Sequence, residues 1–89
     1  MDEKQEHNLL QTYITDPGRF ISTAFRRAST QEPLWFYETL VWEWSRAEKE
    51  TGKLIHSEDS GRRPKTAYER HAELVRLAIA GEPFEEIDG

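Results

Sequence analysis

Three histidines are the side chains of this chain best suited to bind a metal ion or to act as a general base near neutral pH. They occupy positions 7, 56 and 71, and no pair has a ligand spacing such as His-x-x-x-His, or Glu-x-x-His supported by a second copy. His56 is close in sequence to Glu58 and Asp59, but such a group is common on protein surfaces. We expect no metal and no cofactor. We expect His71 to pack in the core, and a role for it as ligand or base stays open.

Nucleophilic and acid–base catalysis have little support in the sequence. Cysteine is absent, and no nucleophile-elbow or phosphate-loop pattern surrounds the serines and threonines. Paired carboxylates need a cleft, which a chain of 89 residues can hardly enclose. We therefore predict that the protein is not an enzyme and takes no small-molecule substrate. An enzyme that uses His71 and a nearby acid in a cavity is the least favoured alternative.

The elements that would position a site are predicted around the stretch 34–44, which contains all three tryptophans. A Thr-Gln-Glu-Pro sequence suits the start of a helix and Gly52 suits its end, so we predict a helix over about 31–51. At about 100° per residue, the main apolar arc of this helix leaves out Trp35 and Trp42. These two residues are seven apart and stack on a second stripe.

Two interpretations of the stripe formed by Trp35 and Trp42 stay open. In the first, the stripe is part of the core and is covered by the N-terminal helix of the same chain. In the second, it is a ridge that binds a partner, with Glu38 and Arg46 as its polar rim, because tryptophan is enriched in interface hot spots.

The remaining apolar residues also recur at helical spacing. They predict three further helices, at about 3–14, 17–28 and 66–80. Thr66 and Glu69 match a capping box at the start of the last of these helices, and Gly81 suits its end. The fold class expected is therefore all-α, a small four-helix bundle or orthogonal helical array. It forms a single domain over 1–89, with a longer loop at 53–63 and an acidic C-terminal tail at 82–89.

The formal net charge is −5, and its sign alternates along the chain. A domain that binds nucleic acid is usually basic on the contacting side, so nucleic-acid binding is our second hypothesis. An accessory protein of this kind would use two groups of basic side chains, one on the second helix and one at the end of the long loop. These residues are Arg19, Arg26, Arg27, Arg62, Arg63 and Lys65.

No run of apolar residues approaches the length of a membrane-spanning helix, and the polar N-terminus does not resemble a signal peptide. Together with the absence of cysteine, this favours a cytoplasmic protein without membrane contact. Our first hypothesis is a small, acidic, non-catalytic interaction or regulatory domain. It would bind a protein partner, or a second copy as a homodimer, through Trp35 and Trp42 with Glu38 and Arg46.

Overall fold

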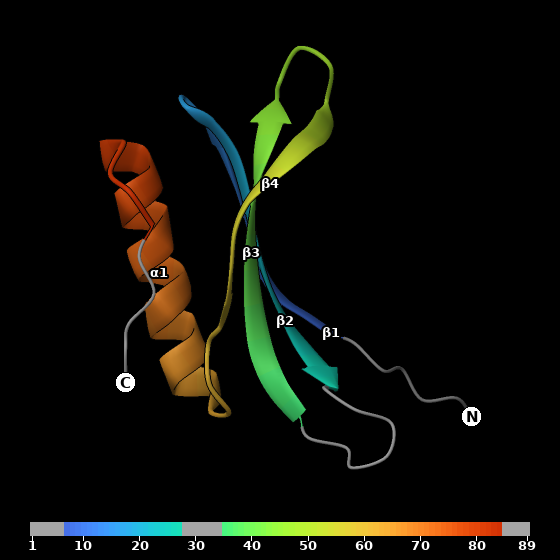
Figure 1. Ribbon diagram of the computed structural model, residues 1–89, viewed down its shortest axis with the longest axis vertical. Coiled ribbons are helices and arrows are strands. Elements are labelled where there is room, and N and C mark those ends of the chain that lie inside the picture. Colours follow the sequence, from blue (N-terminus) through green and yellow to red (C-terminus); the bar gives the residue numbers. More distant parts are fainter. Residues whose placement is uncertain (1–6, 28–34, 85–89) are drawn as a thin grey trace, which may run out of the picture.

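The computed structural model describes residues 7–27 and 35–84, and these form an antiparallel sheet with one helix against it (Figure 1). The sheet has four strands that neighbour one another in chain order. They are β1 (His7–Thr15), β2 (Gly18–Arg27), β3 (Trp35–Ser45) and β4 (Glu50–Asp59), and the helix is α1 (Pro64–Ala80).

The prediction of an all-α bundle is therefore wrong. The ranges 3–14, 17–28 and 31–51, expected to be helices, contain β1, β2 and β3 where they are described. Most of the segment expected to be a loop, 53–63, belongs to β4. The expected starting sequence of the third helix lies outside the described residues, as does most of the expected tail.

Residue composition explains why these segments form strands. All three predicted helices that proved to be strands are rich in threonine, isoleucine, valine and aromatic residues, which fit a pleated surface. The alternation typical of a strand is hidden, because β2 and β3 carry large apolar side chains on both faces. Ile21 and Val41 are fully buried on one face, while Phe20 and Trp42 are their neighbours on the other. A run that is apolar at most positions fits a helical period equally well.

The C-terminal helix is the predicted element that the structure confirms. It ends as expected at Gly81, which has a φ of 74° and donates its backbone N–H to the carbonyl of Ala78. The predicted capping box is wrong, because α1 begins at Pro64 and its N-cap residue, Arg63, makes no side-chain cap. Two large apolar residues of this helix, Tyr68 and Ile79, are exposed.

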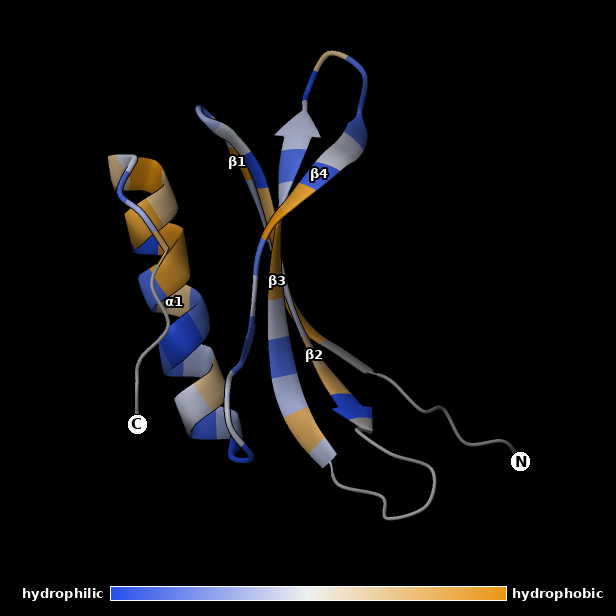
Figure 2. Ribbon diagram, viewed as in Figure 1, coloured by the Kyte–Doolittle hydropathy of each residue, from blue (hydrophilic) through white to orange (hydrophobic). Residues whose placement is uncertain are grey.

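Helix α1 packs on one face of the sheet and forms a small core with it. The buried apolar residues of this core are Ile14, Ile21, Val41, Leu74 and Ala78. Hydrophobic residues are concentrated in the C-terminal half of α1, and its N-terminal half is more polar (Figure 2). The core between helix and sheet is accordingly apolar at one end and polar at the other. Within residues 7–27 and 35–84, α1 is the one helix, and it is neither long enough nor apolar enough to cross a membrane.

Candidate functional site

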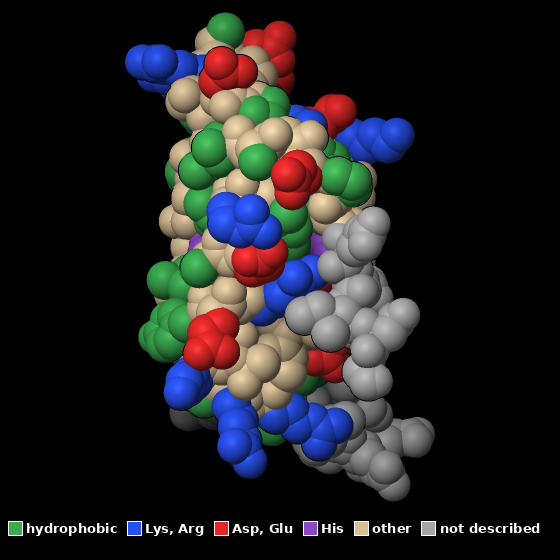
Figure 3. All heavy atoms as spheres, turned by 90° about the vertical axis from the view of Figure 1, so that its left-hand side faces the viewer, with side chains coloured by type: hydrophobic (Ala, Val, Ile, Leu, Met, Phe, Trp, Pro, Cys, Tyr) green, Lys and Arg blue, Asp and Glu red, His purple; other side chains and the backbone are tan. Residues whose placement is uncertain are grey.

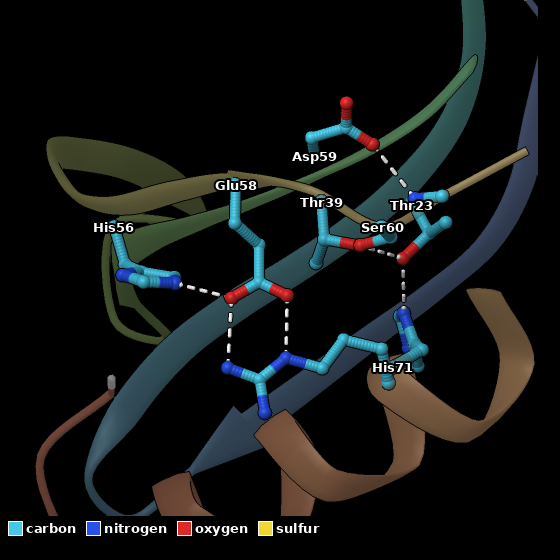
Figure 4. Close-up of polar contacts among 9 residues, drawn as sticks. Thr23, Thr39, His56, Glu58, Asp59, Ser60 and His71 are labelled. Carbon is cyan, nitrogen blue, oxygen red and sulfur yellow. Dashed lines mark hydrogen bonds and ion pairs between the residues drawn. The ribbon is translucent and has the colours of Figure 1, made fainter. Parts of the chain in front are cut away.

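The polar end of the core is a chain of hydrogen bonds centred on His71. Its Nε2 lies 2.8 Å from the hydroxyl of Thr12, and its Nδ1 lies 2.8 Å from the hydroxyl of Thr23. The chain continues from Thr23 to Thr39 and from Thr39 to Ser60, with 2.7 Å between hydroxyl oxygens at each step (Figure 4). One network thus connects α1 with the strands β1, β2 and β3 and with the segment that follows β4. Burial lowers the pKa of His71 below its ordinary value of 6.5.

A buried ion pair lies beside this network. The guanidinium of Arg70 donates from Nε and from its NH2 group to the two carboxylate oxygens of Glu58, and His56 Nε2 lies 2.7 Å from Glu58 Oε1. Burial alone would raise the pKa of Glu58, but the hydrogen bonds from Arg70 and His56 outweigh it. The pKa of Glu58 therefore lies below its ordinary value of 4.5.

These polar groups are enclosed between helix and sheet, so they do not form an accessible reaction site. Thr23, Thr39, Ser60 and His71 are all almost completely buried. We assign them a structural role, because satisfied buried hydrogen bonds fix one arrangement of helix on sheet. His71 is a core residue as expected, with two hydrogen-bond partners.

The side chains at positions 56, 58 and 59, considered above as a weak metal site, do not converge on one point. Glu58 is engaged by His56 and Arg70, whereas Asp59 accepts a hydrogen bond from the backbone N–H of Gly61 and points away from them (Figure 4). Across residues 7–27 and 35–84, no group of three or more acidic, histidine or cysteine side chains is placed to bind a metal ion.

The opposite face of the sheet carries a row of large apolar side chains. Alternation along each strand places Tyr13, Phe20 and Trp42 away from α1, because their neighbours Thr12, Ile21 and Val41 point toward it. Tyr13 pairs with Phe20, Phe20 pairs with Trp42, and Trp42 pairs with Leu54. One residue from each of the four strands thus contributes to a continuous row across the sheet.

Trp44 extends this row into a cluster. Its ring centroid lies 5.0 Å from that of Tyr13, which also stacks on Phe20 at 4.6 Å. Gly18 lies against the backbone of Trp44, and a Cβ at Gly18 would collide with the Trp44 carbonyl oxygen. The absence of a side chain there lets β2 begin close to Trp44. We call the five residues Tyr13, Phe20, Trp42, Trp44 and Leu54 the aromatic face.

The aromatic face is uncovered in the described structure. No described helix or strand lies against it (Figure 1). Tyr13 is 56% exposed and Leu54 is 42% exposed, while the other three residues are half-buried. An antiparallel sheet with one face on the core is usually polar on its other face. The polar part of this face lies farther along the strands, where Arg26 pairs with Glu38 at 2.7 Å.

The predicted partner-binding residues are separated by the strand geometry. Trp35 and Trp42 are an odd number of residues apart on β3, so they point to opposite faces of the sheet. Trp42 belongs to the aromatic face. Trp35 lies on the α1 side and stacks on Phe25, with ring centroids 5.0 Å apart. Glu38 shares the open face with Trp42, and Arg46 lies exposed in the turn between β3 and β4.

The predicted basic residues do not form one surface. Arg19 lies at the start of β2, beside the two hairpins, and Arg26 lies near the far end of the same strand. Arg62, Arg63 and Lys65 are exposed where α1 begins. Lysine and arginine side chains gather at that end of the helix side, whereas both signs of charge are mixed above it (Figure 3). Of Arg27, the structure describes only the backbone, which pairs with Trp35.

Sequence reasoning missed Tyr13, Phe20, Trp44 and Leu54 as members of a site. Each was assigned to a helix face or to a loop, because their proximity arises only from strand pairing. One signal in the sequence could have identified them. An apolar run can be a strand whose alternate residues lie on opposite faces of a sheet, and testing the run for a period of two would have grouped its residues by face.

Comparison with known proteins gives no independent indication of function. No protein-family model, no curated protein and no solved structure matches this chain at a significant level.

Proposed function

We propose that this protein is a protein-interaction domain that binds its partner through the aromatic face. The observation that supports this proposal is the uncovered row of Tyr13, Phe20, Trp42 and Leu54, extended by Trp44. Contiguous exposed apolar side chains on a small domain are typical of interaction surfaces. A cytoplasmic location, expected from the sequence, is part of the same proposal.

The make-up of the face suits protein binding. Tyrosine and tryptophan are the residues that most often dominate interface energetics, because each buries a large area and has few rotatable bonds. Tyr13 already contacts both Phe20 and Trp44, so little side-chain freedom remains to be lost on binding. The Arg26–Glu38 pair supplies a polar border on one side.

Site-specific photo-crosslinking in cells that produce the protein tests this proposal. A photoreactive phenylalanine analogue is placed at Tyr13 in one variant and at Tyr68 in another. Tyr68 is the matched control, because it is a tyrosine of similar exposure, 46%, on the helix layer. We expect ultraviolet light to join a protein to position 13 and to leave position 68 unmodified.

Three results would contradict the proposal. The first is the absence of any adduct at position 13, and the second is equal labelling at positions 13 and 68. The third is an adduct at position 13 that nuclease digestion removes, which would favour nucleic-acid binding instead. A gel shift at several salt concentrations would then be decisive, because binding to phosphates strengthens as the salt concentration falls.

A further inference from the structure

We infer that the partner of the aromatic face is a second copy of this chain, packed face to face as a symmetric dimer. This inference rests on the proposed function, because it names the partner of the same surface. The resulting assembly has four layers: helix, sheet, sheet and helix. Two sheets that pack in this way lie about 10 Å apart, with strand directions about 30° from each other.

The rest of the chain offers little apolar material to cover the face. The residues outside the described structure are 1–6, 28–34 and 85–89. Their large apolar side chains are Met1, Leu34 and Ile87, one in each segment. A cluster of four aromatic rings and a leucine needs a partner of similar apolar area. A second aromatic face supplies that area by definition.

The open side of the sheet, of which the aromatic face is the apolar part, is large enough for a stable dimer. Four strands at a spacing of about 4.8 Å and a length of about 30 Å give this whole side a flat footprint of roughly 600 Å². The accessible surface of side chains on such a footprint is larger than the footprint itself. Stable interfaces bury about 800 Å² on each partner, so contact over the aromatic face and much of the rest of the open side is sufficient.

The charges around the aromatic face also permit self-association. The β1–β2 hairpin and the β3–β4 hairpin border the cluster, and over 16–19 and 43–53 they carry four basic and four acidic side chains. These residues are Arg19, Arg46, Lys49, Lys53, Asp16, Glu43, Glu48 and Glu50. The border is therefore neutral, although the whole chain has a net charge of −5. Four of the excess negative charges lie beyond α1, at Glu82, Glu85, Glu86 and Asp88.

Symmetry makes the cluster complementary to itself. In a twofold dimer the same patch is used by both copies, so an apolar patch meets an apolar patch and a neutral border meets a neutral border. The twofold axis would lie between the two sheets, parallel to both, and above the row of Tyr13, Phe20, Trp42 and Leu54. The row of one copy then stacks on the same row of the other copy. The Arg26–Glu38 pair of each copy then lies toward the periphery of the contact, where it keeps access to water.

Light scattering and sedimentation of the full chain over a range of concentrations test the dimer. We expect the mass of two chains, with dissociation on dilution. In Tyr13→Lys we expect the dimer dissociation constant to rise at least about 30-fold, as for the loss of an interface hot spot. The matched variant Tyr68→Lys, which adds the same charge on the helix layer, should dimerise like the unmodified chain. Circular dichroism verifies that both variants are folded.

A charge-pairing experiment shows whether the face binds itself. Tyr13→Lys and Tyr13→Glu should each be monomeric, because two like charges then meet in the interface. An equimolar mixture of the two should recover dimers that contain one chain of each kind. If Tyr13→Lys is unfolded, Leu54→Lys provides the same test from β4, with Ile79→Lys as its control on α1.

The inference and the proposed function can fail separately. A monomeric chain at all concentrations, or a dimer unaffected by Tyr13→Lys, would overturn the second-copy inference. If position 13 still crosslinks to a different protein, the proposed function stands and only the identity of the partner changes. If position 13 crosslinks to nothing, both are wrong. An adduct between two copies of this chain, together with loss of the dimer in Tyr13→Lys, supports both.

Discussion

The two faces of the sheet differ in how their large side chains are buried. On the face under α1, the fully buried side chains include Ile21, Val41, Thr23 and Thr39 but no aromatic residue among the described positions, and Trp35 and Phe25 stack on this side only half-buried. Trp42 and Trp44 lie on the face that α1 does not cover.

This difference separates two roles that one sheet performs. On the covered face, the buried apolar core packs against the C-terminal half of α1. The hydroxyl groups of threonine and serine and the ring of His71 form a hydrogen-bond network beside that core. Such a network specifies a single arrangement, because each polar group is satisfied only in that geometry. On the open face, a row of large apolar side chains runs across all four strands. We therefore expect stability to depend mainly on the covered face, and the proposed binding to depend on the open one.

The largest expected effect on stability is a difference between two leucine-to-alanine substitutions, one on each face of the sheet. Leu74 is fully buried on α1, so Leu74→Ala should lower the free energy of unfolding by about 3 kcal/mol through lost burial and a residual cavity. Leu54 is 42% exposed on β4, so Leu54→Ala should cost less than about 1 kcal/mol under conditions where the chain is monomeric. Urea denaturation of both variants gives the comparison. Equal losses would show that the open face is as important for stability as the covered one.

A smaller effect is expected from two ion pairs that occupy the two faces. Arg70→Met removes the partner of a buried carboxylate, Glu58, and should lower the free energy of unfolding by about 2 kcal/mol. Arg26→Met breaks the pair with Glu38, whose side chains are 27% to 30% exposed, and should cost less than about 1 kcal/mol.

Thermal or urea unfolding at neutral pH measures both ion-pair variants. The pair on the covered face has a second signature, because the pKa of Glu58 is lowered in the folded state. Its contribution is present above about pH 4.5 and is lost as the pH falls through the folded pKa. A stability of Arg70→Met equal to that of Arg26→Met would contradict the assignment of different roles to the two faces.

The smallest expected effect is a pH dependence that belongs to the covered face alone. Burial lowers the pKa of His71, so below about pH 6.5 the unfolded chain binds more protons than the folded chain. Stability should therefore decrease as the pH falls from about 6.5 toward the folded pKa. Unfolding free energies of the unmodified chain and of His71→Gln, measured at several pH values, test this. His71→Gln should lose most of the slope, and Leu54→Ala should keep it.

Some features of the fold follow from local sequence alone. The helix at 64–80 could be predicted to within two residues of its start, because its apolar spacing, its terminal Gly81 and Pro83 are all local signals. The break between the predicted elements 3–14 and 17–28 was also placed to within one residue, because the structure turns there between β1 and β2. The expectation that His71 is a packed core residue was correct for the same reason, since it depends on the face of a correctly predicted helix.

The candidate site could not be predicted in the same way. Trp35 and Trp42, seven residues apart, share a stripe on a helix but lie on opposite faces of a strand. Tyr13, Phe20 and Leu54 join Trp42 only because their strands pair in one register. Hydrogen bonds between strands are not encoded by any local spacing, and apolar residues on both faces of β2 and β3 conceal the period of two.

The sequence by itself determined the position of one helix, the turn before β2 and the concentration of aromatic residues between positions 35 and 44. Tertiary structure decided that this aromatic segment is a central strand and which of its rings are covered by α1. The physical reason is that helices are built from contacts three and four residues apart, whereas sheets are built from partners distant in the chain. A surface that spans four strands therefore exists only once those partners have met.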